Sequence, residues 1–150
     1  MGLKIFMIEY NKYPSHMPDG TRAALTIATG PVILQDGKVL LDKHGDDTFW
    51  KFPGGRLCDD NSPRANAIRE VQEELGIVVE LVGDPKIFQF TREKNGVIEF
   101  VVLVHYLARI IDGAEISPGR DVREWAWHDI KNLPSDCAPN IAPIVREMSE

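Results

Sequence analysis

The chain is 150 residues long, and its 23 acidic and 17 basic residues give a formal net charge of −6. This acidic balance argues against a nucleic-acid polymer as a partner, because binding to a phosphate backbone depends on clustered Lys and Arg. It leaves room for one small phosphate-bearing ligand. The length fits a single domain over residues 1–150, in which residues 1–20 form an N-terminal strand and loop.

No stretch of the chain stays apolar over the roughly 18 residues that a membrane-spanning helix requires. The apolar run that follows Met1 is too short for a signal peptide. Cys58 and Cys137 are far apart and match no metal or redox spacing. We therefore expect a cytoplasmic protein with reduced thiols and no membrane partner.

Strands dominate the first third of the chain. The dipeptide Asp36-Gly37 lies between two apolar triplets, which is a strong signal for a tight hairpin. Phe6 and Ile8 lie in an alternating segment, and an exposed edge strand there would invite pairing with a second subunit, so a homodimer is left open. The predicted strands cover residues 2–9, 22–29, 32–34 and 39–41, and a polar loop covers residues 11–20.

A helix is predicted over residues 63–75. Ser62 is a good N-cap, Pro63 suits the first helical position, and Gly76 provides a left-handed stop. Beyond it, the predicted strands cover residues 77–82, 86–92, 97–111 and 122–127, a polar loop covers residues 112–120, and helical segments cover residues 129–133 and 139–148. This order of elements predicts one mixed α/β domain.

Three carboxylates gather near the end of the predicted helix. At about 100° per residue, Glu70, Glu73 and Glu74 share one sector, and the apolar residues occupy another about 120° away. Like charges at this spacing repel, and the C-terminal end of a helix disfavours negative charge. The arrangement therefore suggests a bound cation, and carboxylate oxygens favour Mg²⁺ or Mn²⁺ over Zn²⁺. The alternative is a solvated acidic face that Arg64 and Arg69 neutralise.

A glycine turn precedes this helix by a short loop. Gly54 and Gly55 follow Pro53, where a backbone can approach a phosphate or offer a carbonyl to a metal ion. Read from Gly55 to Ile77, the segment resembles the Nudix box, which runs from a glycine to Arg-Glu-apolar-any-Glu-Glu-any-Gly-apolar. The residues in register with the box are Gly55, Arg69, Glu70, Val71, Glu73, Glu74, Gly76 and Ile77. Asn61 stands where the family has its first glutamate.

The resemblance to Nudix hydrolases implies an α/β/α sandwich around a mixed β-sheet. It implies that a bound Mg²⁺, with Mn²⁺ as an alternative, faces a diphosphate and activates water for attack on phosphorus. The implied metal ligands are the carbonyl of Gly55 and the side chains of Glu70, Glu73 and Glu74. Glu73, Glu70 and Arg69 would be catalytic, Arg69 by orienting the carboxylates. Gly54 and Gly55 would contact the substrate.

The implied activity is cleavage of the pyrophosphate bond in a nucleoside diphosphate linked to another group. A nucleoside diphosphate sugar, ADP-ribose and a (deoxy)nucleoside triphosphate all fit, and no motif selects among these small nucleotides. Because Asn61 cannot ionise, a weakly active or inactive nucleotide-binding module is the alternative. We expect the loss of this glutamate to weaken the site rather than to abolish activity.

Residues outside the box are weaker candidates. Asp121, six residues before Trp127, is a candidate for substrate binding, although an ordinary loop acid is the simpler interpretation. We expect His44 to be solvated in a loop rather than to contact a base or sugar. His105 is expected to be a hydrogen-bonded residue of a strand. Trp125 and Trp127 share one face of a strand, and core packing is expected for both.

Overall fold

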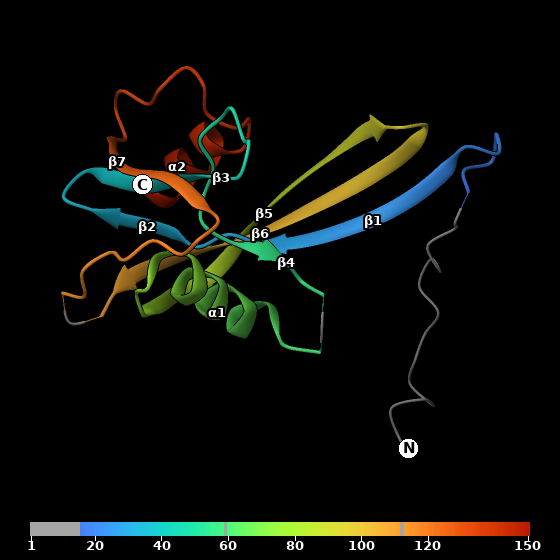
Figure 1. The fold of residues 1–150 in the computed structure, drawn as a ribbon. Helices are drawn as coiled ribbons and strands as arrows, with labels where there is room; N and C mark the ends of the chain where they lie inside the picture. Colours follow the sequence, from blue (N-terminus) through green and yellow to red (C-terminus); the bar gives the residue numbers. More distant parts are fainter. Residues whose placement is uncertain (1–15, 59, 112) are drawn as a thin grey trace.

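The computed structural model describes residues 16–58, 60–111 and 113–150. Over these ranges the chain forms a seven-stranded mixed β-sheet with a helix against each of its faces (Figure 1). The α/β/α sandwich expected from the sequence is confirmed. The strand expected over residues 2–9, with Phe6 and Ile8, lies outside the described residues, so its pairing with a second subunit stays a prediction.

The elements agree closely with those predicted from turn and cap signals. In chain order they are β1 (Arg22–Thr29), β2 (Val32–Gln35), β3 (Lys38–His44), β4 (Gly55–Arg56), α1 (Pro63–Leu75), β5 (Val79–Lys94), β6 (Val97–Ile110), β7 (Val122–Asp129) and α2 (Ile141–Met148). Asp36 and Asn95 have φ values of 51° and 53°, the positive values that the first position of a tight hairpin turn requires.

Strand β6 is the centre of the sheet. β1 and β2 pair with it in parallel, one after the other, and β5 pairs with it antiparallel. β3 and β7 extend the sheet beyond β2, and the short β4 pairs with β1. Figure 1 shows β1, β5 and β6 projecting as a long ribbon beyond the body that surrounds the two helices.

Two segments differ from the prediction. Residues 79–94 form one strand instead of two, because a β-bulge between Val82 and Lys86 shifts the register without ending the pairing with β6. The prediction of a helical segment over residues 129–133 is wrong, because the chain forms a turn there. Asp129 ends β7, its carboxylate accepts a hydrogen bond from the Lys131 amide at 2.9 Å, and this side-chain turn competes with a helix.

Helix α1 forms as predicted. The Ser62 hydroxyl accepts a hydrogen bond from the Ala65 amide at 3.1 Å, and Gly76 ends the helix in the left-handed conformation with φ 66°. Its buried side chains Ala67, Val71 and Leu75 pack on the sheet. The face that carries the glutamates is therefore turned away from the core. Among the described residues, neither helix is long and apolar enough to cross a membrane.

Two hydrophobic clusters hold the layers together, one on each face of the sheet. The cluster under α1 contains Ile33, Leu40, Ala67, Val71, Leu75, Ile77, Val79, Leu81, Val104, Tyr106 and Ala108. The cluster under α2 contains Val32, Val39, Leu41, Trp50, Phe52, Ile141, Ile144 and Val145. Alternation along β2 and β3 sends neighbouring residues to opposite clusters, as the period of a strand requires.

His105 joins β6 to the loop after β1 and to α2. Its Nδ1 donates to the Gly30 carbonyl at 2.9 Å, and its Nε2 accepts from the Asn140 side-chain amide at 3.1 Å. This arrangement satisfies both nitrogens of a neutral imidazole and confirms the expected hydrogen-bonded strand residue. Burial lowers the pKa of His105, although the Gly30 carbonyl acts in the opposite direction.

We predict that His105 makes stability fall in mild acid. Below a pH of about 6.5 the unfolded chain binds a proton at this histidine and the folded chain does not, so unfolding is favoured as pH falls. The loss is at most about 1.4 kcal/mol per pH unit. Urea denaturation at pH 7.5 and 5.5 measures it. In His105→Gln, which cannot titrate, the pH dependence should shrink, and an unchanged dependence would contradict the assignment.

Candidate active site

The turn at Gly54 and Gly55 lies between β1 and α1; Gly54 has no room for a side chain, and Gly55 has room for one only if Glu70 moves. Gly54 has φ 145°, and a Cβ on it would lie 1.9 Å from the Thr29 carbonyl oxygen. A Cβ on Gly55 would lie 2.6 Å from a carboxylate oxygen of Glu70. The pairing of Gly55 with Thr29 in the sheet holds the turn in this place. Backbone and carboxylate are therefore packed in direct contact here.

Glu74 attaches α1 to the same turn. One of its carboxylate oxygens accepts a hydrogen bond from the Gly54 amide at 2.9 Å, and the other lies 3.4 Å from His44 Nε2. Only 15% of the Glu74 side chain is exposed. This carboxylate thus connects the last turn of α1 with the glycine turn and with β3.

Arg69 contacts the other two glutamates. One of its terminal nitrogens donates to both carboxylate oxygens of Glu73 at 3.1 Å. The second donates to Glu70 at 3.1 Å and to the Asn66 side-chain oxygen at 2.7 Å. Asn66 in turn donates to the Gly55 carbonyl oxygen at 3.3 Å. The guanidinium group therefore aligns the Glu70 and Glu73 carboxylates along the exposed face of α1.

The expectation that His44 is a solvated loop residue is wrong. His44 is the last residue of β3, its side chain is 18% exposed, and its Nε2 lies 3.2 Å from Asp42 as well as near Glu74. The hydrogen bond to Asp42, followed by that to Glu74, raises the pKa of His44 to about 10 against the desolvation that lowers it. At neutral pH an imidazolium therefore lies between two carboxylates.

The sequence prediction also missed Asp42, which is fully buried. A signal was available, because alternation from Leu40 along β3 predicts that Asp42 faces the layer of α1, where an isolated charge is costly. Among the described residues, the cluster whose ligand atoms lie within 4.8 Å of one another is Asp42, His44 and Glu74. Glu70 and Glu73 are not part of this cluster, and both carboxylates form ion pairs with Arg69.

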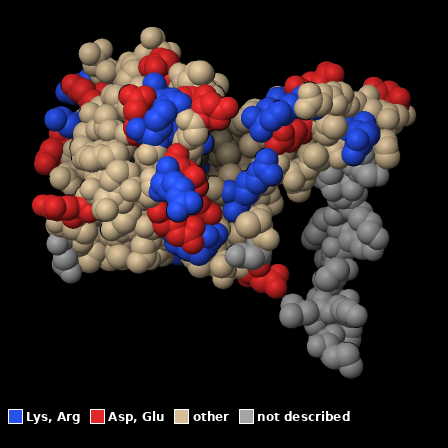
Figure 2. Space-filling model, in the orientation of Figure 1, with Lys and Arg blue, Asp and Glu red and all other residues tan. Residues whose placement is uncertain are grey.

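The larger cavity, about 700 Å³, opens on the other face of the sheet. Thr26 and Leu103 form part of its floor, and Phe49, Phe88 and Phe90 contribute aromatic walls. Figure 2 shows a hollow between the body and the projecting strands, with Lys and Arg side chains beside it. The basic residues that line the cavity are Lys51, Arg56 and Arg92. Gly54 and Gly55 also line it, so the turn separates this cavity from the carboxylates of α1.

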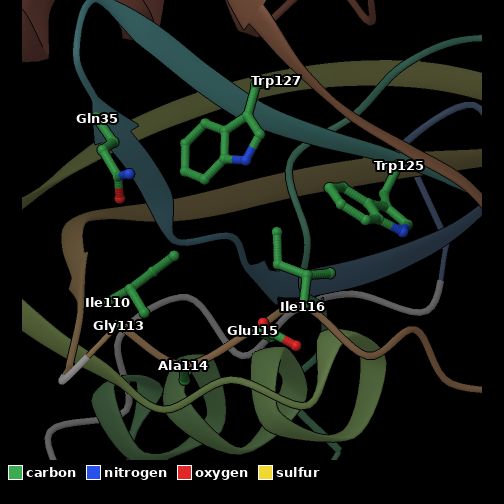
Figure 3. A pocket seen from close by; sticks show the side chains of 8 residues that line it. All are labelled: Gln35, Ile110, Gly113, Ala114, Glu115, Ile116, Trp125 and Trp127. Carbon is green, nitrogen blue, oxygen red and sulfur yellow. The ribbon is translucent and has the colours of Figure 1, made fainter.

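A second cavity of about 500 Å³ lies on the α1 side of the sheet. Figure 3 shows Trp125 and Trp127 above Ile116 and α1, with Gln35 at one side. Trp127 packs against the core cluster under α1 as expected. The expectation of core packing is wrong for Trp125. Its side chain is 38% exposed, because the cavity between it and residues 113–116 stays open.

Comparison with known proteins identifies the family. The model of the NUDIX domain matches residues 24–148, which is most of the chain. The chain belongs to the NUDIX domain family. The resemblance inferred from Gly55 to Ile77 is therefore confirmed.

Individual relatives share only about a quarter to a third of their aligned residues with this NUDIX chain. A MutT-like protein of Streptomyces ambofaciens is 35% identical over half of the chain, and that match spans about half (48%) of the relative. An ADP-ribose pyrophosphatase of Methanocaldococcus jannaschii is 26% identical over 72% of the chain and 64% of the relative. The crystal structure of the MutT NUDIX hydrolase from Burkholderia pseudomallei superposes with a TM-score of 0.71, covering 84% of this chain and 98% of that one at 24% identity. This last likeness shows the fold.

Two of the predicted positions lie at the margin of the NUDIX site. The Asp121 carbonyl accepts a hydrogen bond from Gly45 at 3.0 Å, which brings the segment before β7 next to the end of β3. Its side chain is exposed and does not line the larger cavity. Asn61 is exposed in the bend before Ser62. Substrate binding by Asp121 and the effect of Asn61 stay predictions.

We predict that an added methyl group weakens metal binding at Gly55 and weakens the fold at Gly54. In Gly55→Ala the new Cβ meets the mobile end of Glu70, so the carboxylate is displaced while the fold is kept. Divalent-metal affinity should fall about 10- to 100-fold, the usual result when a ligand loses its support. In Gly54→Ala the Cβ meets the backbone of Thr29, and stability should fall by about 1–3 kcal/mol.

Mn²⁺ titration followed by electron paramagnetic resonance and urea denaturation measure these two effects. Glu70→Gln is the matched comparison for Gly55→Ala, because it removes the charge of the carboxylate that Gly55→Ala displaces and leaves the backbone unaltered. Normal Mn²⁺ affinity in Gly55→Ala would show that the contact with Glu70 does not support a metal ligand.

Proposed function

We propose that this NUDIX chain is a Mg²⁺-dependent pyrophosphohydrolase that cleaves a nucleoside diphosphate linked to another group. The observation that carries the proposal is the position of the Gly54–Gly55 turn. On one side of the turn lies a cavity of about 700 Å³ with aromatic and basic lining residues, and on the other side lie the carboxylates of α1. A nucleoside in the cavity would present its diphosphate to those carboxylates across the turn.

The cavity suits a nucleoside. Its volume falls in the range of small-molecule sites. Phe49 and Phe90 are 41% and 37% exposed, so their rings are accessible to a base that stacks on them. Arg56, on β4 beside Gly55, lines the cavity next to the glycine turn. We assign Arg56 to a phosphate group, since guanidinium nitrogens pair well with phosphate oxygens.

The proposed metal ligands are the Gly55 carbonyl, Glu70, Glu73 and Glu74. The residues fit a divalent ion, because three carboxylates supply the hard oxygen ligands that Mg²⁺ prefers and Gly55 leaves no Cβ between its carbonyl and Glu70. When bound, the ion neutralises diphosphate charge and lowers the pKa of a water molecule.

The chain's own residues would align the reaction and move its proton. Glu73 is 59% exposed and is the most accessible of the three glutamates, so we assign it the proton of the attacking water. The oxygen of this water forms a bond to phosphorus while the bond between phosphorus and the bridging oxygen breaks. Arg69 would hold Glu73 and Glu70 in position by its three contacts with their oxygens. The Gly54 and Gly55 backbone would contact the diphosphate.

We predict that Glu73→Gln lowers kcat at least about 100-fold, because a positioned general base contributes this much or more. The melting temperature should stay the same, since the side chain is exposed and does not contribute to the core. Steady-state hydrolysis with Mg²⁺ measures the effect. The matched control is Glu147→Gln, an exposed glutamate on α2. Wild-type turnover in Glu73→Gln would exclude the assigned base.

A substrate panel tests the function and separates the two open substrate classes. ADP-ribose and nucleoside diphosphate sugars yield two phosphomonoesters, so phosphate appears only after alkaline phosphatase is added. Triphosphates yield pyrophosphate, so phosphate appears after inorganic pyrophosphatase is added. Tight nucleotide binding by calorimetry, without products in Mg²⁺ or Mn²⁺, would overturn the enzyme and support the nucleotide-binding module.

We predict that Asn61→Glu keeps or raises turnover. Asn61 stands at the box position of the first glutamate, and a carboxylate there should support the site rather than form an innermost ligand. The measurement is kcat with Mg²⁺, with Mn²⁺ affinity as a separate readout. Normal Mn²⁺ affinity with lost turnover would show that the loop before α1 is out of the expected register.

A further inference from the structure

The cluster of Asp42, His44 and Glu74 has the composition and spacing of a second metal site. Two carboxylates and one imidazole come together from β3 and from the last turn of α1. His44 Nε2 lies 3.2 Å from an Asp42 oxygen and 3.4 Å from a Glu74 oxygen. Ligand atoms bound to the same first-row ion at about 2.1 Å lie roughly 3.0–3.4 Å apart in octahedral or tetrahedral geometry. The two distances match this spacing without a movement of the backbone.

An independent observation at Asp42 also points to a ligand. Its side chain is fully buried, and its Oδ1 atom has no hydrogen-bond partner among the described residues. A buried polar atom left without a partner costs about 1–3 kcal/mol, and more when it carries charge. The other oxygen of the same carboxylate faces His44. A buried carboxylate that belongs to a cluster of ligand atoms and has an oxygen without a hydrogen-bond partner fits a cation-binding role.

We propose that Asp42, His44 and Glu74 bind a divalent transition-metal ion at a second site, which shares only Glu74 with the Mg²⁺ site assigned to the Gly55 carbonyl, Glu70, Glu73 and Glu74. The imidazole determines the class of ion, because nitrogen ligands suit Zn²⁺, Co²⁺ and Fe²⁺, whereas Mg²⁺ takes oxygen ligands. Two carboxylates also balance the 2+ charge of the ion. The ion takes the place of the proton on His44 Nε2, and that proton leaves to solvent.

The site ties three segments together. Glu74 presents one oxygen to this cluster while its other oxygen accepts from the Gly54 amide. An ion held by Asp42 and His44 therefore fixes β3, α1 and the glycine turn relative to one another. An ion that binds only the folded chain raises its stability by mass action. The inference goes beyond the proposed function, because it requires neither a substrate nor turnover.

Co²⁺ titration of the chelator-treated full-length protein tests the site. Saturating Mg²⁺ is kept present so that it occupies the Gly55 carbonyl, Glu70 and Glu73, the ligands that the second site does not use. We expect one equivalent of Co²⁺ per chain by calorimetry, visible d–d absorption of a nitrogen- and oxygen-bound ion, and a rise in melting temperature. No Co²⁺ binding under these conditions would overturn the proposal.

Variants identify the ligands. Asp42→Asn and His44→Gln should each weaken Co²⁺ binding at least about 100-fold, since loss of a ligand costs more than loss of its outer support. His44→Cys offers a thiolate in place of the imidazole, so it should retain Co²⁺ and add a sulfur-to-cobalt charge-transfer band in the near ultraviolet. This band requires residue 44 to be a ligand. Binding that is unchanged in His44→Gln would overturn the assignment.

Glu70→Gln and Glu73→Gln are the matched controls. Each removes one carboxylate from α1 while leaving the Asp42, His44 and Glu74 cluster intact. Both should lose hydrolysis and keep Co²⁺ affinity, which separates failure of the proposed function from failure of this site. If either control loses Co²⁺ to the same extent as His44→Gln, the ion is bound by the face of α1 and the proposal is wrong.

Discussion

The close packing of the Gly54–Gly55 turn between β1 and α1 is the constraint on which the site depends. The Gly54 backbone touches the Thr29 carbonyl so closely that no Cβ fits, and Gly55 lies against the Glu70 carboxylate. The Glu74 carboxylate then holds the Gly54 amide. Because these contacts are made by backbone and charged groups, the turn cannot move without breaking a hydrogen bond or exposing a buried carboxylate.

This turn connects two faces of the sheet that have different properties. One face carries α1 with its row of glutamates, and the other carries a cavity with aromatic and basic residues. β1 and β6 pair in parallel and both contribute residues to the cavity. The glycine turn pairs with the end of β1, so it lies at the edge of the cavity. This order of groups supports our proposal that the ligand carries an aromatic ring with phosphates next to it.

Charge is distributed unevenly around α1. Glu70 and Glu73 share Arg69, so their repulsion is offset within the helix itself. Glu74 instead points to His44 and the buried Asp42, away from Arg69. Two carboxylates this close in a poorly solvated place require a cation between them. An imidazolium meets that requirement in one state, and a metal ion meets it in the state that we propose.

The local structure could be predicted from the sequence because short-range chemistry decides it. Ser62, Pro63 and Gly76 set the ends of α1, and Asp36-Gly37 and Asn95-Gly96 set two hairpins through backbone conformations that do not depend on distant residues. The Nudix box likewise lies within 23 consecutive residues, Gly55 to Ile77, and could be recognised without the fold.

Contacts between distant segments were decided only by the tertiary structure. His44 was expected to be solvated and Trp125 to be buried, and both expectations were wrong because exposure depends on which segments cover a strand. Asp42 and Glu74 are 32 positions apart, and only the packing of α1 on the sheet brings them together. The sequence by itself thus determined the glycine turn, the box and the ends of the helix. It did not determine which group each carboxylate contacts, because the contacts of a side chain depend on how the sheet and the helices pack.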